Sequence, residues 1–273
     1  MSKMSKIVIW LVGIMVISFV TAGVVFAATE GFKNSFGGVK TTQIIDEENT
    51  FKIEGLKQLD IESLSRDINF ITVHDTDEIK VHYHGEITRF LGKSSYNYKA
   101  EVNEDRLIVD VESKSYGIIV NSNLKLDIYI PSSYAEEINI KSVSGDVNIE
   151  NLNLTSLDII TTSGDIDLND LAVSTTKIAT VSGDLIFEDY DGNLDLKTTS
   201  GDIDINYSDV EFNNDLDIDT VSGDIEIYFP DGATFDLDMS TVSGDTKNEL
   251  GFDPESTNKI KVKTVSGDLE LLK

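Results

Sequence analysis

Seven aspartates that each follow a Ser-Gly pair are the residues of this chain best arranged to do chemistry together. They are Asp146, Asp165, Asp184, Asp202, Asp224, Asp245 and Asp268. On stacked turns about 5 Å apart their charges would repel one another, and a hard cation such as calcium would relieve that repulsion. The alternative is that each aspartate hydrogen-bonds the amides of its own turn and faces water. The cation ladder is therefore a hypothesis, and the sequence predicts no firm metal site and no cofactor.

A second candidate for metal binding is the segment His82-Tyr83-His84-Gly85-Glu86. On a β-strand its two histidines and its glutamate would share one face, where histidines two residues apart can bind one zinc ion. Val81 and Tyr83 alternate with the histidines and are the apolar members of the strand, so we expect the histidines to face solvent. The third histidine, His74, is expected in a loop. Neither the pair His82 and His84 nor His74 is enough to predict a zinc site.

Acid–base catalysis is the third chemistry that the composition invites. Paired carboxylates hydrolyse glycosidic bonds when a cleft raises the pKa of one of them. Because the chain has 49 acidic residues, two neighbouring carboxylates carry no information by themselves. The sequence contains no P-loop and no G-x-G-x-x-G, G-x-S-x-G or H-E-x-x-H motif. We therefore expect a protein that is not an enzyme, with a secreted carbohydrate-active β-helix enzyme as the alternative.

The aspartates belong to an internal repeat, and each copy has alternating apolar residues on both sides of Ser-Gly-Asp. One copy reads LDIITTSGDIDL, residues 157–168. Strict alternation predicts a strand with one buried face, and the inward positions change parity at the glycine, which requires a corner there. Glycine can take a positive φ at such a corner without a steric penalty. The predicted corner residues are Ser144, Gly145, Ser163, Gly164, Ser182, Gly183, Ser200, Gly201, Ser222, Gly223, Ser243, Gly244, Ser266 and Gly267.

The repeat length, 18 to 23 residues, fits one coil of a stacked fold. Such coils bury their apolar face only against one another, about 4.8 Å apart in parallel ladders. The sequence therefore predicts an all-β protein, a parallel β-solenoid of about seven to eight coils. One hydroxyl residue per coil should point inward and bond to the next hydroxyl or to backbone. These residues are Ser142, Thr161, Thr180, Thr198, Thr220, Thr241 and Thr264.

The pattern divides the chain into four regions. Residues 141–273 are the solenoid repeats, and residues 51–140 are predicted to form an N-terminal β cap that is continuous with them. Within the cap, residues 59–70, LDIESLSRDINF, fit the repeat with Arg66 in place of glycine and are expected to form a degenerate first coil. Residues 29–50 are polar and are predicted to form a stalk. Residues 1–28 are predicted to be a transmembrane anchor, with a signal peptide as the alternative.

The anchor prediction depends on an uncharged run of 22 residues from Ile7 to Ala28. This length crosses a bilayer core of about 30 Å as a helix. Lys3 and Lys6 precede the run and favour an inside position for that end. We expect a single-pass protein of the cell membrane with an extracellular solenoid. A cytoplasmic solenoid with an inverted anchor is the alternative.

The rest of the chain is strongly acidic, with 20 basic and 49 acidic residues after residue 28. Such a surface repels nucleic acid, so no nucleic-acid partner is expected. The acidic residues could simply keep the exterior solvated. Alternatively, they could gather cations or a cationic partner.

The last copy of the repeat, KTVSGDLELLK at residues 263–273, is expected to end the stack with an open sheet edge. Lys261, Lys263 and Lys273 would then discourage pairing at that edge. Otherwise the edge would dock a second copy or a partner strand. The second reading predicts weak self-association at the C-terminal coil, which a proline at Leu269 should abolish.

Three segments together are similar to the DUF4097 family of bacterial adhesin-like proteins. They are LDIESLSRDINFITVHDTDEIKVHYHG, LKLDIYIPSSY and the repeated TVSGDI, and the resemblance covers about residues 50–273. It implies a β-solenoid protein of the cell envelope with no established chemistry. The expected function is therefore non-enzymatic binding by a membrane-anchored protein, in adhesion or in sensing envelope stress, with an unknown envelope or surface ligand.

Overall fold

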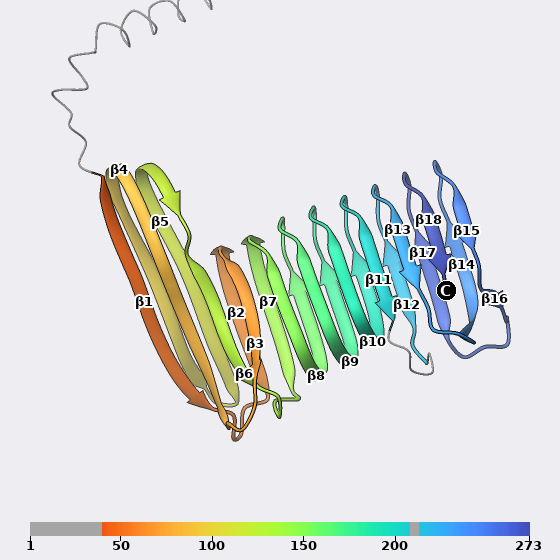
Figure 1. Cartoon of the computed structure of the whole chain (residues 1–273), viewed down its shortest axis with the longest axis horizontal. Helices are drawn as coiled ribbons and strands as arrows, with labels where there is room; N and C mark the ends of the chain where they lie inside the picture. Colours follow the sequence, from red (N-terminus) through yellow and green to blue (C-terminus); the bar gives the residue numbers. More distant parts are fainter. Residues whose placement is uncertain (1–39, 208–212) are drawn as a thin grey trace, which may run out of the picture.

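The computed structural model describes residues 40–207 and 213–273, in which all regular secondary structure is β-strand. The strands are β1 (Thr41–Lys52), β2 (Gln58–Ser65), β3 (Asp67–Val73), β4 (Glu78–Asn103), β5 (Arg106–Ser122), β6 (Lys125–Pro131), β7 (Glu137–Ser144), β8 (Val147–Ile160), β9 (Ile166–Ala179), β10 (Leu185–Lys197), β11 (Ile203–Tyr207), β12 (Leu216–Asp219), β13 (Ile225–Tyr228), β14 (Thr234–Ser240), β15 (Thr246–Asn248), β16 (Gly251–Phe252), β17 (Lys259–Lys263) and β18 (Leu269–Leu272). Figure 1 shows them side by side in one elongated stack. The all-β prediction is confirmed.

Successive coils stack in parallel and in register. β8, β9 and β10 each run from just after one Ser-Gly-Asp corner almost to the next corner, bending on the way. Val147 of β8 pairs with Ile166 of β9, which in turn pairs with Leu185 of β10. Equivalent positions of the repeat therefore form columns along the stack, as a solenoid requires.

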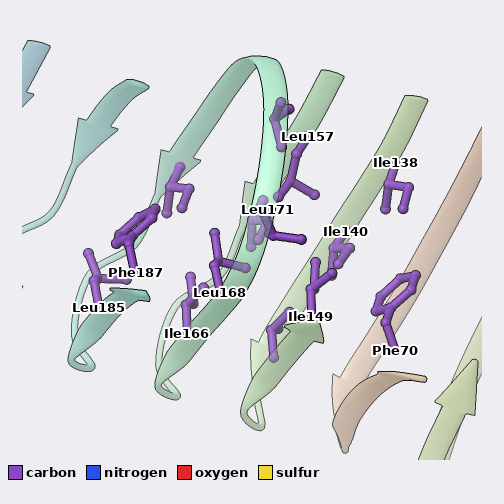
Figure 2. Packing of buried hydrophobic residues seen from close by; sticks show 14 of the residues in the cluster. Phe70, Ile138, Ile140, Ile149, Leu157, Ile166, Leu168, Leu171, Leu185 and Phe187 are labelled. Carbon is purple, nitrogen blue, oxygen red and sulfur yellow. The ribbon is translucent and has the colours of Figure 1, made fainter. Parts of the chain in front are cut away.

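The interior of the stack is filled by the apolar residues that alternate along each strand. In one coil, Leu157 and Ile159 before the corner and Ile166 and Leu168 after it are almost completely buried. Figure 2 shows side chains of this kind from neighbouring coils gathered in one continuous interior. The predicted change of parity at the corner glycine is confirmed.

Buried hydroxyl groups line the inner side of the corners. Six of the seven predicted positions are buried, namely Ser142, Thr161, Thr180, Thr198, Thr220 and Thr264. Each of these hydroxyls donates to the carbonyl oxygen of the serine two residues later, at 3.0–3.3 Å. Thr241 is only half-buried and donates to Gly267 O. The hydroxyls therefore bond to backbone, one of the two arrangements expected.

The degenerate coil is present as β2 and β3, with Arg66 at the corner. It lies inside the stack, because β2 pairs with both β5 and β7, and β3 pairs with both β6 and β8. β4 covers this end by pairing antiparallel with β5 and β6, and β1 pairs antiparallel with β4. The pairings of β4 are therefore antiparallel, whereas the coils pair in parallel.

Part of the predicted stalk is a strand. Residues 41–50, assigned to the polar stalk of residues 29–50, form most of β1. Its polar composition concealed it, because among the described strands β1 pairs only with β4, and Ile45 is its one buried residue. The charges at residues 46–48 are typical of an edge strand, where they discourage further pairing.

The last Ser-Gly-Asp coil does not end the stack. β17 pairs with β12 and β14, and β18 pairs with β13 and β15, all in parallel. Ser266 correspondingly bridges Ser222 on one side and Ser243 on the other. The prediction of an open edge at residues 263–273 is therefore wrong, because the coil at Ser243 is outermost. Leu269 is fully buried, so a proline there would damage the interior of the sheet rather than test self-association.

Charge gives a physical reason for this order. In the register, Lys261 of β17 lies opposite Asp217 of β12 on one edge and Asp238 of β14 on the other. Its ammonium pairs with Asp217 and Asp219, and Lys263 pairs with Asp238 at 2.8 Å. The hydrogen bond to Asp217 raises the pKa of Lys261. Direct pairing of β12 with β14 would place two acidic rows side by side, which is unfavourable, whereas the basic strand between them alternates the sign.

Residues 40–207 and 213–273 contain no helix long and apolar enough to cross a bilayer. The predicted anchor, residues 1–28, lies outside the described residues.

Candidate functional site

The seven Ser-Gly-Asp corners follow one another along one side of the stack (Figure 1). Their glycines have φ between 115° and 144°, a region that favours glycine. A Cβ added at any of them would lie 2.0–2.3 Å from a backbone carbonyl oxygen of the neighbouring coil. Glycine is thus needed both for the backbone angle and for the close contact between coils. The sequence pattern predicted only the first of these reasons.

The corner aspartates join neighbouring coils instead of capping their own turns. In each case a carboxylate Oδ1 accepts a hydrogen bond from the backbone N–H of the aspartate in the adjacent coil, at 2.8–3.3 Å. From the cap outward, the carboxylates of this ladder are Asp67, Asp146, Asp165, Asp184, Asp202, Asp224 and Asp268, and the last N–H donor is Asp245. These charge-assisted bonds offset part of the repulsion expected along the row.

The aspartate ladder has no grouping typical of a metal centre. In the part of the chain that the structure describes, no three His, Cys, Asp or Glu side chains come together so as to hold a metal ion. Each carboxylate of the ladder already uses one oxygen for the adjacent coil. The calcium hypothesis stays a prediction, and titration of the metal against the melting temperature would test it.

A column of exposed, mostly apolar residues runs beside the aspartate ladder. It is made by the residue before each corner serine, and its members along the stack are Leu64, Val143, Thr162, Val181, Thr199, Val221, Val265 and Val242. We call this column and the aspartate ladder together the Ser-Gly-Asp ridge. This column was not predicted, although the sequence carries a signal for it, valine at the outward position of Thr-x-Ser-Gly-Asp. Repeated exposure of apolar side chains on an acidic protein is typical of an interaction surface.

The two histidines of β4 lie on one face, as predicted, but are half-buried rather than fully exposed. Their rings stack with centroids 4.2 Å apart. His82 Nε2 lies 2.7 Å from Asp46 Oδ1 of β1, and His84 Nε2 lies 2.8 Å from Asp127 Oδ2 of β6. Each imidazole therefore has its own carboxylate, and the pair ties β4 to the strands on both of its edges.

Two hollows lie away from the ridge. A groove of about 490 Å³ is lined by residues of three coils, among them Asn153, Ser174 and Asn193. The Asn193 side chain donates to Ser174 O and accepts the N–H of Asp215, so its amide holds coils together. A second hollow of similar volume includes His74, whose Nδ1 lies 3.0 Å from Ser132 Oγ. His74 and Ser132 are both exposed, so this hollow is a weaker candidate than the ridge.

Asp204 of β11 lies among other acidic residues next to the ridge. Partial desolvation raises the pKa of Asp204, and the charges of Glu226 and Glu188 raise it further. Since the folded state then holds this proton more tightly than the unfolded state, ionised Asp204 lowers stability as pH rises through its pKa. At pH 7, Asp204→Asn is expected to increase the free energy of unfolding by a few tenths of a kcal/mol, about the size of a surface charge interaction, and so to raise the melting temperature slightly. Near pH 3 it should have no effect. A lower melting temperature at pH 7, in thermal unfolding followed by circular dichroism, would contradict this.

Comparison with known proteins gives a family match that covers the cap and the coils. A sequence model described as Toastrack DUF4097 matches residues 56–203 and 156–272. Similar solved structures include a "putative cell adhesion protein" from Clostridium sporogenes ATCC 15579, with 14% identity, a TM-score of 0.36 and coverage of 85% of this chain and 100% of that one. They also include a "putative adhesin" from Bacteroides fragilis NCTC 9343, with 15% identity, a TM-score of 0.46 and coverage of 84% and 97%. No functionally curated protein matches the chain.

Proposed function

Because this chain belongs to the Toastrack DUF4097 family, as its sequence motifs suggested, we propose that it is a non-enzymatic binding protein of the cell envelope. In this proposal residues 1–28 anchor it in the cell membrane and the solenoid projects outward. The binding event would serve adhesion or the sensing of envelope stress. A carbohydrate-active enzyme is the alternative that the same experiments test.

The observation that carries the proposal is the Ser-Gly-Asp ridge. It presents the same two columns along the coils, an exposed and mostly apolar one and an acidic one. Because the coils are about 4.8 Å apart, the ridge repeats its chemistry at short, regular intervals along the stack. A surface of this kind suits an extended partner that makes many equivalent weak contacts, and it has the length to engage several repeats of that partner at once.

A ridge variant should separate binding from folding. Val143→Asp, Val181→Asp and Val221→Asp together are expected to abolish binding of the full-length protein to arrayed cell-wall glycans and polysaccharides, with little change in melting temperature. Ile160→Asp is the matched control, because Ile160 is comparably exposed but lies outside the ridge. Unchanged binding by the triple variant would refute the role of the ridge. Release of cleaved products from any glycan would favour the enzyme alternative.

Topology is tested separately by protease shaving of intact cells. We expect added protease to degrade the solenoid while cytoplasmic markers stay intact, because Lys3 and Lys6 favour an inside N-terminus. Lysed cells provide the control for intrinsic cleavability. Protection of the solenoid in intact cells, together with cleavage after lysis, would contradict the outward orientation and support an inverted anchor.

A further inference from the structure

One part of the cap has a charge opposite to that of the rest of the chain. It consists of residues 40–45, 87–97 and 113–122, which we call the cap ribbon. These ranges contain four basic residues, Lys40, Arg89, Lys93 and Lys114, and no acidic residue, although the chain as a whole has 49 acids. The cap ribbon is therefore a basic region on an otherwise acidic molecule.

The cap ribbon also exposes large apolar side chains. Ile44 is 77% exposed, and the consecutive residues Ile118, Ile119 and Val120 are 56%, 42% and 49% exposed. Successive residues of a strand point to opposite faces, so exposure of three in a row means that neither face of β5 is covered here. The pairing of β4 with β5 shifts register between Thr88 and Leu91, opposite these residues. An uncovered run of this kind is costly unless something packs against it.

The cap ribbon lies where the described chain begins. Thr41, at the start of β1, pairs with Arg89 of β4, and Ile87 of β4 pairs with Ser122 at the end of β5. Figure 1 shows the start of β1 beside this part of β4 and β5. Only eleven residues separate Ala28, the end of the uncharged run, from Lys40. They span at most about 3.5 Å each when extended, so the cap ribbon stays within about 40 Å of that run.

We propose that the cap ribbon docks on the surface of the membrane that holds the N-terminal segment, so this inference rests on the anchoring part of the proposed function. Ile44, Ile118, Ile119 and Val120 enter the boundary between headgroups and acyl chains, and the basic residues attract anionic headgroups. Exposed apolar side chains combined with basic ones are the composition that binds such an interface. The acidic coils are repelled by the same headgroups, so the ribbon fixes which end of the stack faces the bilayer.

The chain has no cysteine, which allows one introduced cysteine to carry an environment-sensitive fluorophore. Val120→Cys reports on the cap ribbon, and Val181→Cys on the ridge is its matched control, because the exposed fractions are 49% and 51%. Each full-length variant is reconstituted into vesicles with anionic lipid and a brominated lipid quencher. We expect the label at residue 120 to emit at shorter wavelength and to lose emission to the quencher. The label at residue 181 should keep the spectrum of a label in water.

A charge variant separates docking from simple proximity to the bilayer. Lys40→Glu, Lys93→Glu and Lys114→Glu, combined with Val120→Cys, are expected to reduce the quenching at residue 120 on anionic vesicles. Flotation of the same samples reports independently on the anchor. If the protein floats with the vesicles but the label at residue 120 keeps the emission spectrum of a label in water, the docking is refuted and the anchor is still supported.

Two other outcomes would also overturn the docking. Protein that does not float refutes the anchor and, with it, the docking. A wavelength shift at residue 120 that increases with protein density but is insensitive to the lipid quencher would mean that a second copy covers the cap ribbon.

Discussion

Removal of residues 259–273 is expected to lower the thermal stability of this protein more than any single substitution. These residues form β17 and β18, which supply four almost completely buried side chains, Ile260, Val262, Leu269 and Leu271. Within residues 40–207 and 213–273, β14 and β15 pair with the coils only through them. Losing four such side chains costs about 2–5 kcal/mol for each, a sum comparable to the whole stability of a typical domain.

The truncated chain cannot repair itself by closing the gap. If β14 moved against β12, Asp238 would replace Lys261 as the neighbour of Asp217, so that two carboxylates faced each other. Hydrogen exchange should therefore show loss of protection in β14 and β15, while β8 and β9 remain protected. Removal of Lys273 alone is the control and should change little, because that residue is exposed. Equal melting temperatures for the two truncations would contradict the order of coils described here.

Gly183→Ala is expected to be among the most damaging small substitutions in the solenoid. The new Cβ would lie 2.1 Å from the carbonyl oxygen of Gly164, a backbone atom that cannot rotate away, and φ at residue 183 is 123°. Separating the coils to make room would break the ladders on both sides of the corner. We expect a loss of more than about 3 kcal/mol, or roughly 6–12 °C in melting temperature for a domain of this size.

Two controls separate the causes of that loss. Gly232 also has a positive φ, 87°, but an added Cβ there meets nothing within 4 Å, so Gly232→Ala measures the backbone angle alone, about 1–2 kcal/mol. Asp184→Asn keeps a side-chain oxygen that can accept the N–H of Asp202 and removes one charge, so it should be mild. If Gly183→Ala cost no more than Gly232→Ala, the close contact between coils would not be the reason for glycine.

The sequence predicts the coils well because two independent patterns identify each buried apolar residue. One is the alternation of apolar and polar residues along a strand, and the other is the recurrence of the same position in every repeat. Leu157, Ile159, Ile166 and Leu168 are buried as both patterns require. The order of the last coils is not predictable in the same way, because parallel coils with the same apolar pattern could stack in any order. The row of lysines at 259, 261 and 263, facing aspartates on two strands, contained the missing information.

The candidate site was only half predictable. The corner aspartates were identified from their spacing, but their hydrogen-bond partners were not. A carboxylate at a repeated corner can reach an amide of its own turn or of the adjacent one, and the choice depends on the closeness of the coils at glycine. The cap ribbon could not be predicted from the sequence. Its excess of basic over acidic residues becomes a surface feature only when three segments that are distant in sequence pair as neighbours.

The placement of β17 and β18 inside the stack affects how the protein is made. In the described part of the chain, β14 and β15 precede β17 and β18 in the sequence but pair with the coils only through them. The outermost coil therefore has none of its described neighbours to dock on while it is being synthesised. Coils as far as β13 can be added one at a time as the chain is synthesised. Residues 230–258, within which β14 pairs with β16, must then wait for a coil to pair with until residues 259–272 emerge. The rate at which the chain emerges sets the length of that wait.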